Sequence, residues 1–379
     1  MGGTLLAMSW FPDAILPVFP IMNSVAPSVL GHAPSPRILH KAPTTAVAAI
    51  PRIVAFGGGT GLPVVLRGLA DAILAAAGDV NPEELVDRLA AIVTVTDDGG
   101  SSGRLRRDLG VLPPGDVRNC LAALSSDAAF GRLLDHRFDG GTDLSGHAIG
   151  NLMLAALTRM TGSFTVAIDE MARILGARGR VFPSTCEDVT LRAELASGEF
   201  VEGETVIATH PASIRRLSLA RPVRPWPDAL RALINADVIV VGPGSLYTSV
   251  LPNLLVDGVA STLAAVGGTR ICVANLMTQP GETDGMSLDD HLRVLRDHTG
   301  HDLFDYILVN GTQPTQAQLA PYRREGAQLI RLDGLLRAAG RAKVLEADLL
   351  DVGSDHVRHD GAKLASAILE IAQRTGATH

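Results

Sequence analysis

The chain contains few aromatic residues and has no excess of basic over acidic residues. Aromatic side chains make up 4% of its 379 residues, and 33 Lys and Arg residues face 40 Asp and Glu residues, which gives a formal net charge of −7. Proteins that hold single-stranded nucleic acid rely on stacking aromatics and on a positive field. This composition therefore argues against nucleic acid as a partner. The length and the 46% of hydrophobic residues suffice for a large globular core.

Cysteine is also scarce. Cys120, Cys186 and Cys272 are far apart and do not show the spacing of a metal finger. An odd and sparse set of cysteines is typical of proteins that work in a reducing compartment. We therefore expect a cytoplasmic protein.

The first 50 residues lack the features of a targeting or membrane segment. No Lys or Arg occurs before Arg37, whereas a signal peptide begins with basic residues. Prolines at positions 12, 17, 20 and 27 interrupt the apolar stretches, whereas a membrane helix needs about 20 continuous apolar residues. We expect no membrane span and interpret residues 1–50 as a poorly ordered extension before a single domain at 51–379. A folded N-terminal hairpin is the alternative.

A strand, a glycine turn and a helix follow each other in residues 52–69. Ile53–Phe56 has the apolar pattern of a buried strand, and the helix that starts near Pro63 has an apolar face. The glycines between them let backbone N–H groups approach an anion beside the positive end of the helix dipole. The alternative is a tight turn that binds nothing. We predict phosphate binding by Gly57, Gly58, Gly59, Thr60 and Gly61.

Acids, hydroxyls and arginines follow the second predicted strand, Leu89–Val95. Ligands of parallel α/β sheets bind at the carboxyl ends of strands, where an arginine can hold phosphate through paired hydrogen bonds. A flexible, solvated loop is the alternative interpretation. The candidate ligand-binding residues of this stretch are Asp98, Ser101, Ser102, Arg104 and Arg106.

Two further segments begin helices with polar residues. The Pro-Pro-Gly sequence before Asp116 predicts that this residue caps a helix, which also carries Asn119. His147 and Asn151 are four residues apart and therefore share one face of another helix. A structural role and a ligand-binding role are equally compatible with His147. Asn119, His147 and Asn151 are candidate ligand-binding residues.

The pattern changes near residues 178–222. Short segments with alternating or β-branched residues are separated by Gly-containing turns, which predicts a small antiparallel β insertion that forms either a dimer surface or a lid. The segments are Arg180–Phe182, Val189–Ala193, Thr205–His210 and Ile214–Leu219.

The strand and glycine turn pattern returns at residues 236–249. Ala236–Val241 predicts a buried strand, and the turn after it leads into a helix rich in hydroxyls. Glycine turns that follow strands of one parallel sheet lie at the same edge, where they can hold a diphosphate or two separate phosphates. The candidates here are Gly242, Pro243, Gly244, Ser245, Tyr247 and Thr248.

Six motifs in a fixed order carry a family resemblance. They are GGGTGL at Gly57–Leu62, TDDGGSSGRLR at Thr96–Arg106, GDVRNCL at Gly115–Leu121, GHAIGNL at Gly146–Leu152, VGPGSLYTSVLPNLLV at Val241–Val256 and ANLMTQPGETDGMS at Ala274–Ser287. Through them the chain resembles the gluconeogenesis factor family, which shares a superfamily with 2-phospho-L-lactate transferase.

The resemblance implies an α/β fold with a Rossmann-like, mostly parallel sheet flanked by helices. It also implies a cytoplasmic, homo-oligomeric protein that binds UDP-N-acetylglucosamine or a similar UDP-sugar and regulates cell shape and the cell wall during gluconeogenic growth. Tyr322 in PYRRE and Arg358 in VRHD match ligand positions of the family. Tyr322 can stack on a base or sugar and Arg358 can hold a phosphate, whereas the alternatives are a surface aromatic and a helix-end salt bridge.

The motifs are compatible both with an enzyme and with a binding protein. The transferase relatives move a phospholactyl group from a nucleoside diphosphate donor to a deazaflavin with the help of a divalent metal. Under this alternative Asp97 and Asp98 are the catalytic candidates, because their carboxylate oxygens are ligands of the kind that magnesium prefers. Our first interpretation is a regulatory binding protein without an assigned cofactor. An NAD-dependent oxidoreductase is disfavoured, because its ribose-binding acid comes about 20 residues after the glycines, whereas Asp97 follows Gly57 by 40.

Overall fold

The computed structural model describes residues 47, 49–141, 143–210, 213–332 and 337–376, which belong to one compact unit, Pro43–His379. The predicted poorly ordered extension, residues 1–50, lies outside the described residues except for Val47, Ala49 and Ile50. Val47 and Ile50 are buried in the main apolar core, so the end of this segment is part of the folded unit. No helix in the described ranges is long and apolar enough to cross a membrane.

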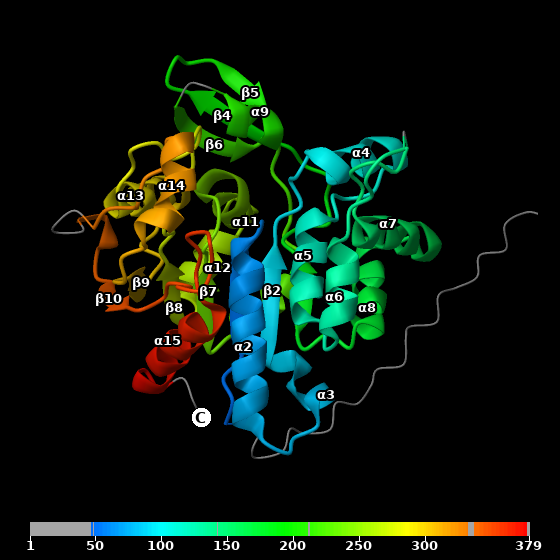
Figure 1. Ribbon diagram of the computed structural model, residues 1–379, viewed down its shortest axis with the longest axis horizontal. Helices are drawn as coiled ribbons and strands as arrows, with labels where there is room; N and C mark the ends of the chain where they lie inside the picture. The colour runs from blue at the N-terminus through cyan, green and yellow to red at the C-terminus, as the bar shows by residue number, and fades with distance from the viewer. Residues whose placement is uncertain (1–46, 48, 142, 211–212, 333–336, 377–379) are drawn as a thin grey trace, which may run out of the picture. The chain divides into compact units, whose positions relative to one another are not determined.

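A parallel sheet of seven strands lies at the centre of the described part of the chain (Figure 1). All of its neighbouring strand pairs are parallel. The predicted α/β fold with a mostly parallel sheet is therefore confirmed. In spatial order the strands are β10 (Lys343–Ala347), β9 (Tyr306–Asn310), β8 (Thr269–Val273), β7 (Val238–Val241), β1 (Ile53–Gly57), β2 (Leu89–Val93) and β3 (Arg180–Pro183).

Helices cover both faces of this sheet. Side chains alternate along each strand, so Ile53 and Ala55 of β1 join one apolar cluster while Val54 and Phe56 join the other. Burial on both faces explains why the strands read as continuous apolar runs. The first cluster contains residues of α2 (Gly61–Ala77), α5 (Gly115–Leu124), α6 (Ala128–Asp135), α7 (Ile149–Thr161), α8 (Phe164–Ile174) and α15 (Gly361–Arg374), and the second contains residues of α10 (Pro227–Ile234), α11 (Leu251–Leu254), α12 (Val259–Ala265) and α13 (Leu288–Thr299).

The described ranges also contain further α-helices. They are α3 (Pro82–Leu85), α4 (Gly100–Leu109), α9 (Glu204–Thr209) and α14 (Gln316–Glu325). In Figure 1, α2 and α15 lie side by side, in agreement with the close approach of Gly68 to Gly361. A Cβ on Gly68 would overlap with the carbonyl of Gly361, so this glycine lets the two helices approach closely.

The predicted antiparallel insertion is present with two corrections. It consists of β4 (Leu191–Leu195), β5 (Phe200–Glu202) and β6 (Ile214–Leu219), which form a separate antiparallel sheet. Arg180–Phe182 belongs to β3, which extends the parallel sheet beside β2. Most of Thr205–His210 is the helix α9, because the carboxylate of Asp98 accepts hydrogen bonds from the backbone and hydroxyl of Thr205 in its first turn. That cap comes from a distant part of the chain, so the local sequence pattern did not reveal it.

Candidate functional site

The two glycine turns meet where the strand order reverses. From β1 the chain builds the sheet outward through β2 and β3, and then β7 pairs with the opposite side of β1. Open parallel sheets bind their ligands at the carboxyl ends of the strands beside such a reversal. The N–H of Gly242 donates to the carbonyl of Phe56 at 3.0 Å. A Cβ on Gly61 would overlap with the carbonyl of Pro243. The two turns are in contact, as the sequence predicted.

The backbone N–H groups of the second turn already donate hydrogen bonds to other residues of the protein. Besides the bond from Gly242, the N–H of Gly244 donates to Oδ1 of Asn275 at 3.0 Å, and Pro243 has no N–H. Nδ2 of Asn275 donates back to the carbonyl of Gly244 at 2.7 Å. Gly242, Pro243 and Gly244 therefore leave no free amide for a phosphate, and this turn shapes a wall of the site instead.

Asp116 occupies part of the first turn. Its carboxylate accepts a hydrogen bond from the N–H of Gly59, and a Cβ on Gly58 would overlap with its Oδ2. Gly58 thus leaves room for a side chain of the protein itself. Burial, and to a smaller degree the carboxylate of Asp97, raises the pKa of Asp116 to about 6. The predicted capping role is corrected, because α5 has Pro114 at its N-cap and Asp116 within its first turn.

The N-terminus of α2 remains open to an anion. The side chain of its N-cap, Thr60, makes no capping hydrogen bond, and the first turn of α2 contains no acidic residue. Uncapped N–H groups and the helix dipole both favour negative charge at such a position. Thr60 and Gly61 line a cavity of about 350 Å³. The start of α2 therefore offers amide donors at this cavity, which Gly57–Gly59 do not line.

This cavity joins segments that are distant in the sequence. In addition to the start of α2, its lining includes the second turn at Pro243 and Gly244, the segment after β8 at Asn275, Tyr322 of α14, and Arg358 ahead of α15. The two residues that the family resemblance singled out thus lie at the same cavity as the two glycine turns.

Tyr322 and Arg358 contribute different chemistry to the cavity. The hydroxyl of Tyr322 donates to the carbonyl of Val357 at 3.0 Å, which fixes the ring beside the segment that carries Arg358. Burial raises the pKa of Tyr322. Arg358 is exposed, and its guanidinium makes no hydrogen bond or ion pair with any residue that the structure describes. It is therefore available to an anionic ligand.

A second group of predicted residues forms a buried hydrogen-bonded cluster on α4 and α7. Oγ of Ser101 lies 2.9 Å from Nδ1 of His147 and accepts a hydrogen bond from Nδ2 of Asn151 at 3.1 Å. Burial lowers the pKa of His147, so its imidazole is neutral near pH 7. Arg104 donates to the carbonyl of Ser145 at 2.6 Å. These bonds join α4 to α7 and to the segment just before it.

Ser102 and Asn119 support the first turn from α4 and α5. Oγ of Ser102 accepts a hydrogen bond from the N–H of Gly115 at 3.1 Å, which fixes the start of α5. Nδ2 of Asn119 donates to the carbonyl of Gly59 at 3.2 Å. The 350 Å³ cavity is not lined by any residue of this second group, which consists of Ser101, Ser102, Arg104, Asn119, His147 and Asn151.

Carboxyl groups gather near the first turn. Oδ1 of Asp97 accepts the N–H of Gly99 at 2.9 Å. Glu204 of α9 is partly buried, and its Oε2 is enclosed without a hydrogen-bond partner among the described residues. Burial is the largest cause that raises the pKa of Glu204 to about 9, and the nearby carboxylates of Asp97, Asp116 and Asp98 add to it.

Magnesium does not fit these carboxyl groups as they stand. Within the described ranges no three His, Cys, Asp or Glu side chains are arranged to hold a metal ion. Oδ1 of Asp98 already accepts hydrogen bonds from the N–H and hydroxyl of Thr205, at 2.9 and 2.7 Å. Asp97 and Asp98 therefore do not form a preformed metal site.

Glu282 organises the hydroxyls after the second turn. Oγ of Ser245 donates to its carboxylate, and Oγ1 of Thr248 lies 2.7 Å from Oγ of Ser245 and 3.3 Å from Oε1 of Glu282. Burial raises the pKa of Glu282. Ser245 also lines the 350 Å³ cavity, whereas Thr248 does not.

Two predicted ligand-binding residues are engaged elsewhere. The guanidinium of Arg106 lies 2.5 Å from the carboxylate of Asp188 and ties α4 to the chain just before β4. Tyr247 is buried, and its ring packs edge-on against that of His298 with 6.3 Å between the ring centroids. Neither residue lines the 350 Å³ cavity.

Several polar residues at this edge of the sheet were not among the sequence candidates. They are Asp116, Glu204, Asn275, Glu282 and His359. Asp116 lies in the GDVRNCL motif, and Asn275 and Glu282 both lie in the ANLMTQPGETDGMS motif, so two of the six motifs carried a signal for these residues. Glu204 lies in none of these motifs, whereas His359 follows Arg358 in the VRHD sequence. Only tertiary contacts bring both residues to this edge.

Comparisons with known proteins agree with this architecture. A family model described as 2-phospho-L-lactate transferase CofD matches residues 53–350. A protein named gluconeogenesis factor from Halalkalibacterium halodurans is 42% identical over 329 residues, which cover 86% of this chain and 98% of the relative. A protein of the same name from Bacillus subtilis is 41% identical over 324 residues, which cover 85% of this chain and 98% of the relative. A crystal structure from Bacillus halodurans, described as a member of the UPF0052 family, has a TM-score of 0.77 and 41% identity and covers 84% of this chain and 99% of that one.

Proposed function

The chain belongs to the gluconeogenesis factor family, and from this premise we propose that it is a regulatory protein that binds a UDP-sugar such as UDP-N-acetylglucosamine. The ligand is held in the cavity between the two glycine turns. In this proposal the protein acts in the cytoplasm and links the ligand to cell shape and cell-wall homeostasis during gluconeogenic growth.

One observation carries the ligand class: a single cavity combines two features that attract anions with an aromatic side chain. The open N-terminus of α2 and the guanidinium of Arg358 can each stabilise a phosphate. Tyr322 adds an aromatic surface on which a base or a sugar can pack. This combination favours a ligand that carries a diphosphate together with a sugar or a base.

Calorimetric titration with UDP-N-acetylglucosamine tests the proposal. We expect the wild-type chain to bind and Arg358→Ala to bind about 10-fold to 100-fold more weakly, because a charge-assisted hydrogen bond contributes about 1.5–3 kcal/mol. Arg323→Ala is the matched control, since Arg323 is an exposed arginine of α14 that does not line the cavity. If the folded wild-type protein binds no UDP-sugar at millimolar concentration, the proposal is rejected.

A phosphotransferase of the 2-phospho-L-lactate transferase type is the second candidate function. The match of the family model to residues 53–350 favours it, whereas the arrangement of the carboxyl groups argues against a preformed magnesium site. Incubation with a nucleoside diphosphate-linked phospholactyl donor, a deazaflavin and magnesium tests it. Product that disappears in Asp98→Asn would support this function, and a folded protein that forms no product would exclude it.

A further inference from the structure

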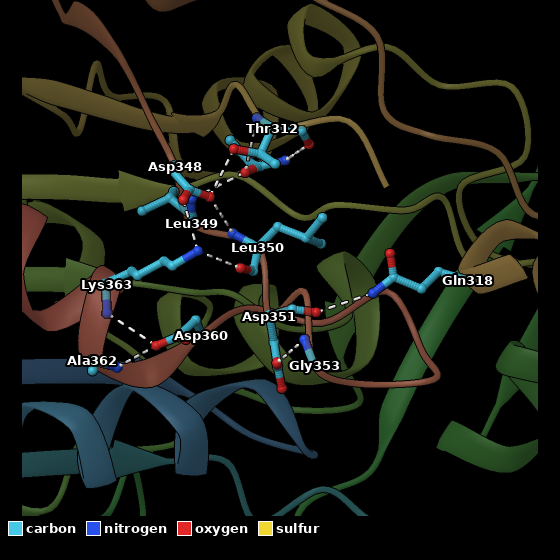
Figure 2. A network of polar contacts seen from close by, with 11 residues as sticks. Thr312, Gln318, Asp348, Leu349, Leu350, Asp351, Gly353, Asp360, Ala362 and Lys363 are labelled. Carbon is cyan, nitrogen blue, oxygen red and sulfur yellow. Dashed lines mark hydrogen bonds and ion pairs between the residues drawn. The ribbon is translucent and has the colours of Figure 1, made fainter. Parts of the chain in front are cut away.

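The segment between β10 and α15 carries Arg358 and His359 to the cavity and is held in place by a polar network (Figure 2). Nζ of Lys363 donates to Oδ2 of Asp348 at 2.7 Å and to the carbonyl of Leu350 at 2.9 Å. Nε2 of Gln318 on α14 donates to the carbonyl of Asp351 at 3.0 Å. The segment is thus anchored to α14 and α15 on both sides.

His359 is enclosed in this wall. The residue is 8% exposed and borders the 350 Å³ cavity. One ring nitrogen forms a hydrogen bond with the backbone of Ala274, at the end of β8. The other, Nε2, is buried and has no hydrogen-bond partner among the described residues. The bond to Ala274 is therefore made by Nδ1, which carries the hydrogen and leaves a lone pair on Nε2.

An unpartnered lone pair requires a hydrogen-bond donor. A buried polar atom without a partner is unfavourable, so a ligand group that donates to Nε2 gains binding energy at this position. The oxygens of an ionised phosphate only accept hydrogen bonds and cannot serve. Hydroxyl groups of a sugar or ribose and N–H groups of a base or an acetamide can.

We propose that His359 is a ligand-binding residue of the cavity, whose Nε2 accepts a hydrogen bond from a hydroxyl or N–H group of the ligand beside the anion held by Arg358. This inference rests on the proposed UDP-sugar function and deepens it. Arg358 and the start of α2 bind the anionic part of the ligand, whereas His359 binds its sugar or its base. Burial lowers the pKa of His359 to about 4, so the ring stays neutral and keeps its lone pair at physiological pH.

Two substitutions distinguish the role of Nδ1 of His359 from that of Nε2. The side-chain amide of Asn reaches about as far as Nδ1, so His359→Asn can keep the bond to Ala274 but lacks the acceptor at the Nε2 position. The amide of Gln reaches about as far as Nε2, so His359→Gln can keep the acceptor but loses the bond to Ala274. Affinities for UDP-N-acetylglucosamine and for inorganic pyrophosphate are measured by calorimetry on the full chain, and the melting temperature of each variant is recorded.

We expect His359→Asn to bind UDP-N-acetylglucosamine about tenfold more weakly and to bind pyrophosphate within about twofold of the wild type. His359→Gln keeps more of the UDP-sugar affinity although its melting temperature is lower. A purely structural role predicts the reverse order, in which the Asn variant binds like the wild type and the Gln variant binds worse. That reverse order, or equal UDP-sugar affinity in all three proteins, would overturn the inference.

Nitrogen NMR of the wild-type protein with isotope-labelled histidine keeps the inference testable if a variant fails to fold. The Nε2 resonance of His359 should shift on addition of UDP-N-acetylglucosamine and stay in place on addition of pyrophosphate. An unchanged resonance in the presence of bound UDP-sugar refutes the role of His359. Failure of the wild-type chain to bind the UDP-sugar at all refutes the proposed function instead, so the two failures are distinguishable.

Discussion

Replacement of Glu204 by Gln is expected to stabilise the protein, and to do so more strongly as the pH rises. Burial and neighbouring carboxylates raise the pKa of Glu204 from 4.5 to about 9. Because its pKa is higher in the folded state than in the unfolded state, the stability associated with this group is fully present below about pH 4.5. It is lost progressively as the pH rises towards about 9. A glutamine side chain stays neutral throughout and does not lose this stability.

The magnitude follows from the pKa difference. At pH 7 the unfolded state has released the proton of Glu204 and the folded state has not, which gives a limit of about 3 kcal/mol at about 1.4 kcal/mol per pKa unit. Relaxation around the side chain raises the effective dielectric constant, so we expect a gain of roughly 1–2 kcal/mol for Glu204→Gln.

Urea unfolding at pH 5 and at pH 8 in the presence of EDTA measures this effect. EDTA keeps divalent cations from neutralising the carboxylates. Glu199→Gln is the control, because Glu199 is an exposed carboxyl group between β4 and β5 of the same insertion. We expect a larger gain for Glu204→Gln at pH 8 than at pH 5, and a change within about 0.5 kcal/mol for the control at both. A gain that does not depend on pH, or a loss of stability at pH 8, would refute the account of Glu204.

Three further substitutions test the packing of the site. Gly61→Ala places a Cβ against the carbonyl of Pro243 and should weaken UDP-sugar binding by about tenfold or more, which calorimetry would show; unchanged affinity would disprove the close contact of the two turns. Gly68→Ala should destabilise the protein by about 2 kcal/mol in urea unfolding, although alanine normally favours a helix, because its Cβ would overlap with the carbonyl of Gly361. Arg106→Ala should lower the melting temperature, because the ion pair with Asp188 is lost, and leave UDP-sugar affinity within about twofold at low and high salt; an affinity loss that grows at low salt would instead support direct contact with phosphate.

The local sequence predicted the elements that depend on short-range patterns. Ile53–Phe56 and Val238–Val241 are apolar runs because both faces of their strands are buried, and glycine turns follow both. Parallel strands place their carboxyl ends on one edge, so the meeting of the two turns also followed from the sequence. The antiparallel insertion was predicted less well, since Thr205 lies in the first turn of a helix that Asp98 caps from far away in the chain.

Long-range contacts decided which of the glycine-turn groups are available to a ligand. Gly58 makes room for Asp116, and Asn275 takes the N–H of Gly244, so the amides expected to bind phosphate are partly used by the protein itself. Neither contact can be predicted from the periodic pattern of apolar residues, because each joins residues that are far apart along the chain.

The sequence by itself therefore determined the parallel sheet, the edge where the two glycine turns meet and the family, since these depend on burial patterns and ordered motifs. The tertiary structure alone decided that the start of α2, Tyr322, Arg358 and His359 share one cavity and that Glu204 is enclosed among carboxylates. The physical reason is that the burial of a polar atom and its hydrogen-bond partners depend on neighbours from distant segments, which only the folded chain brings together.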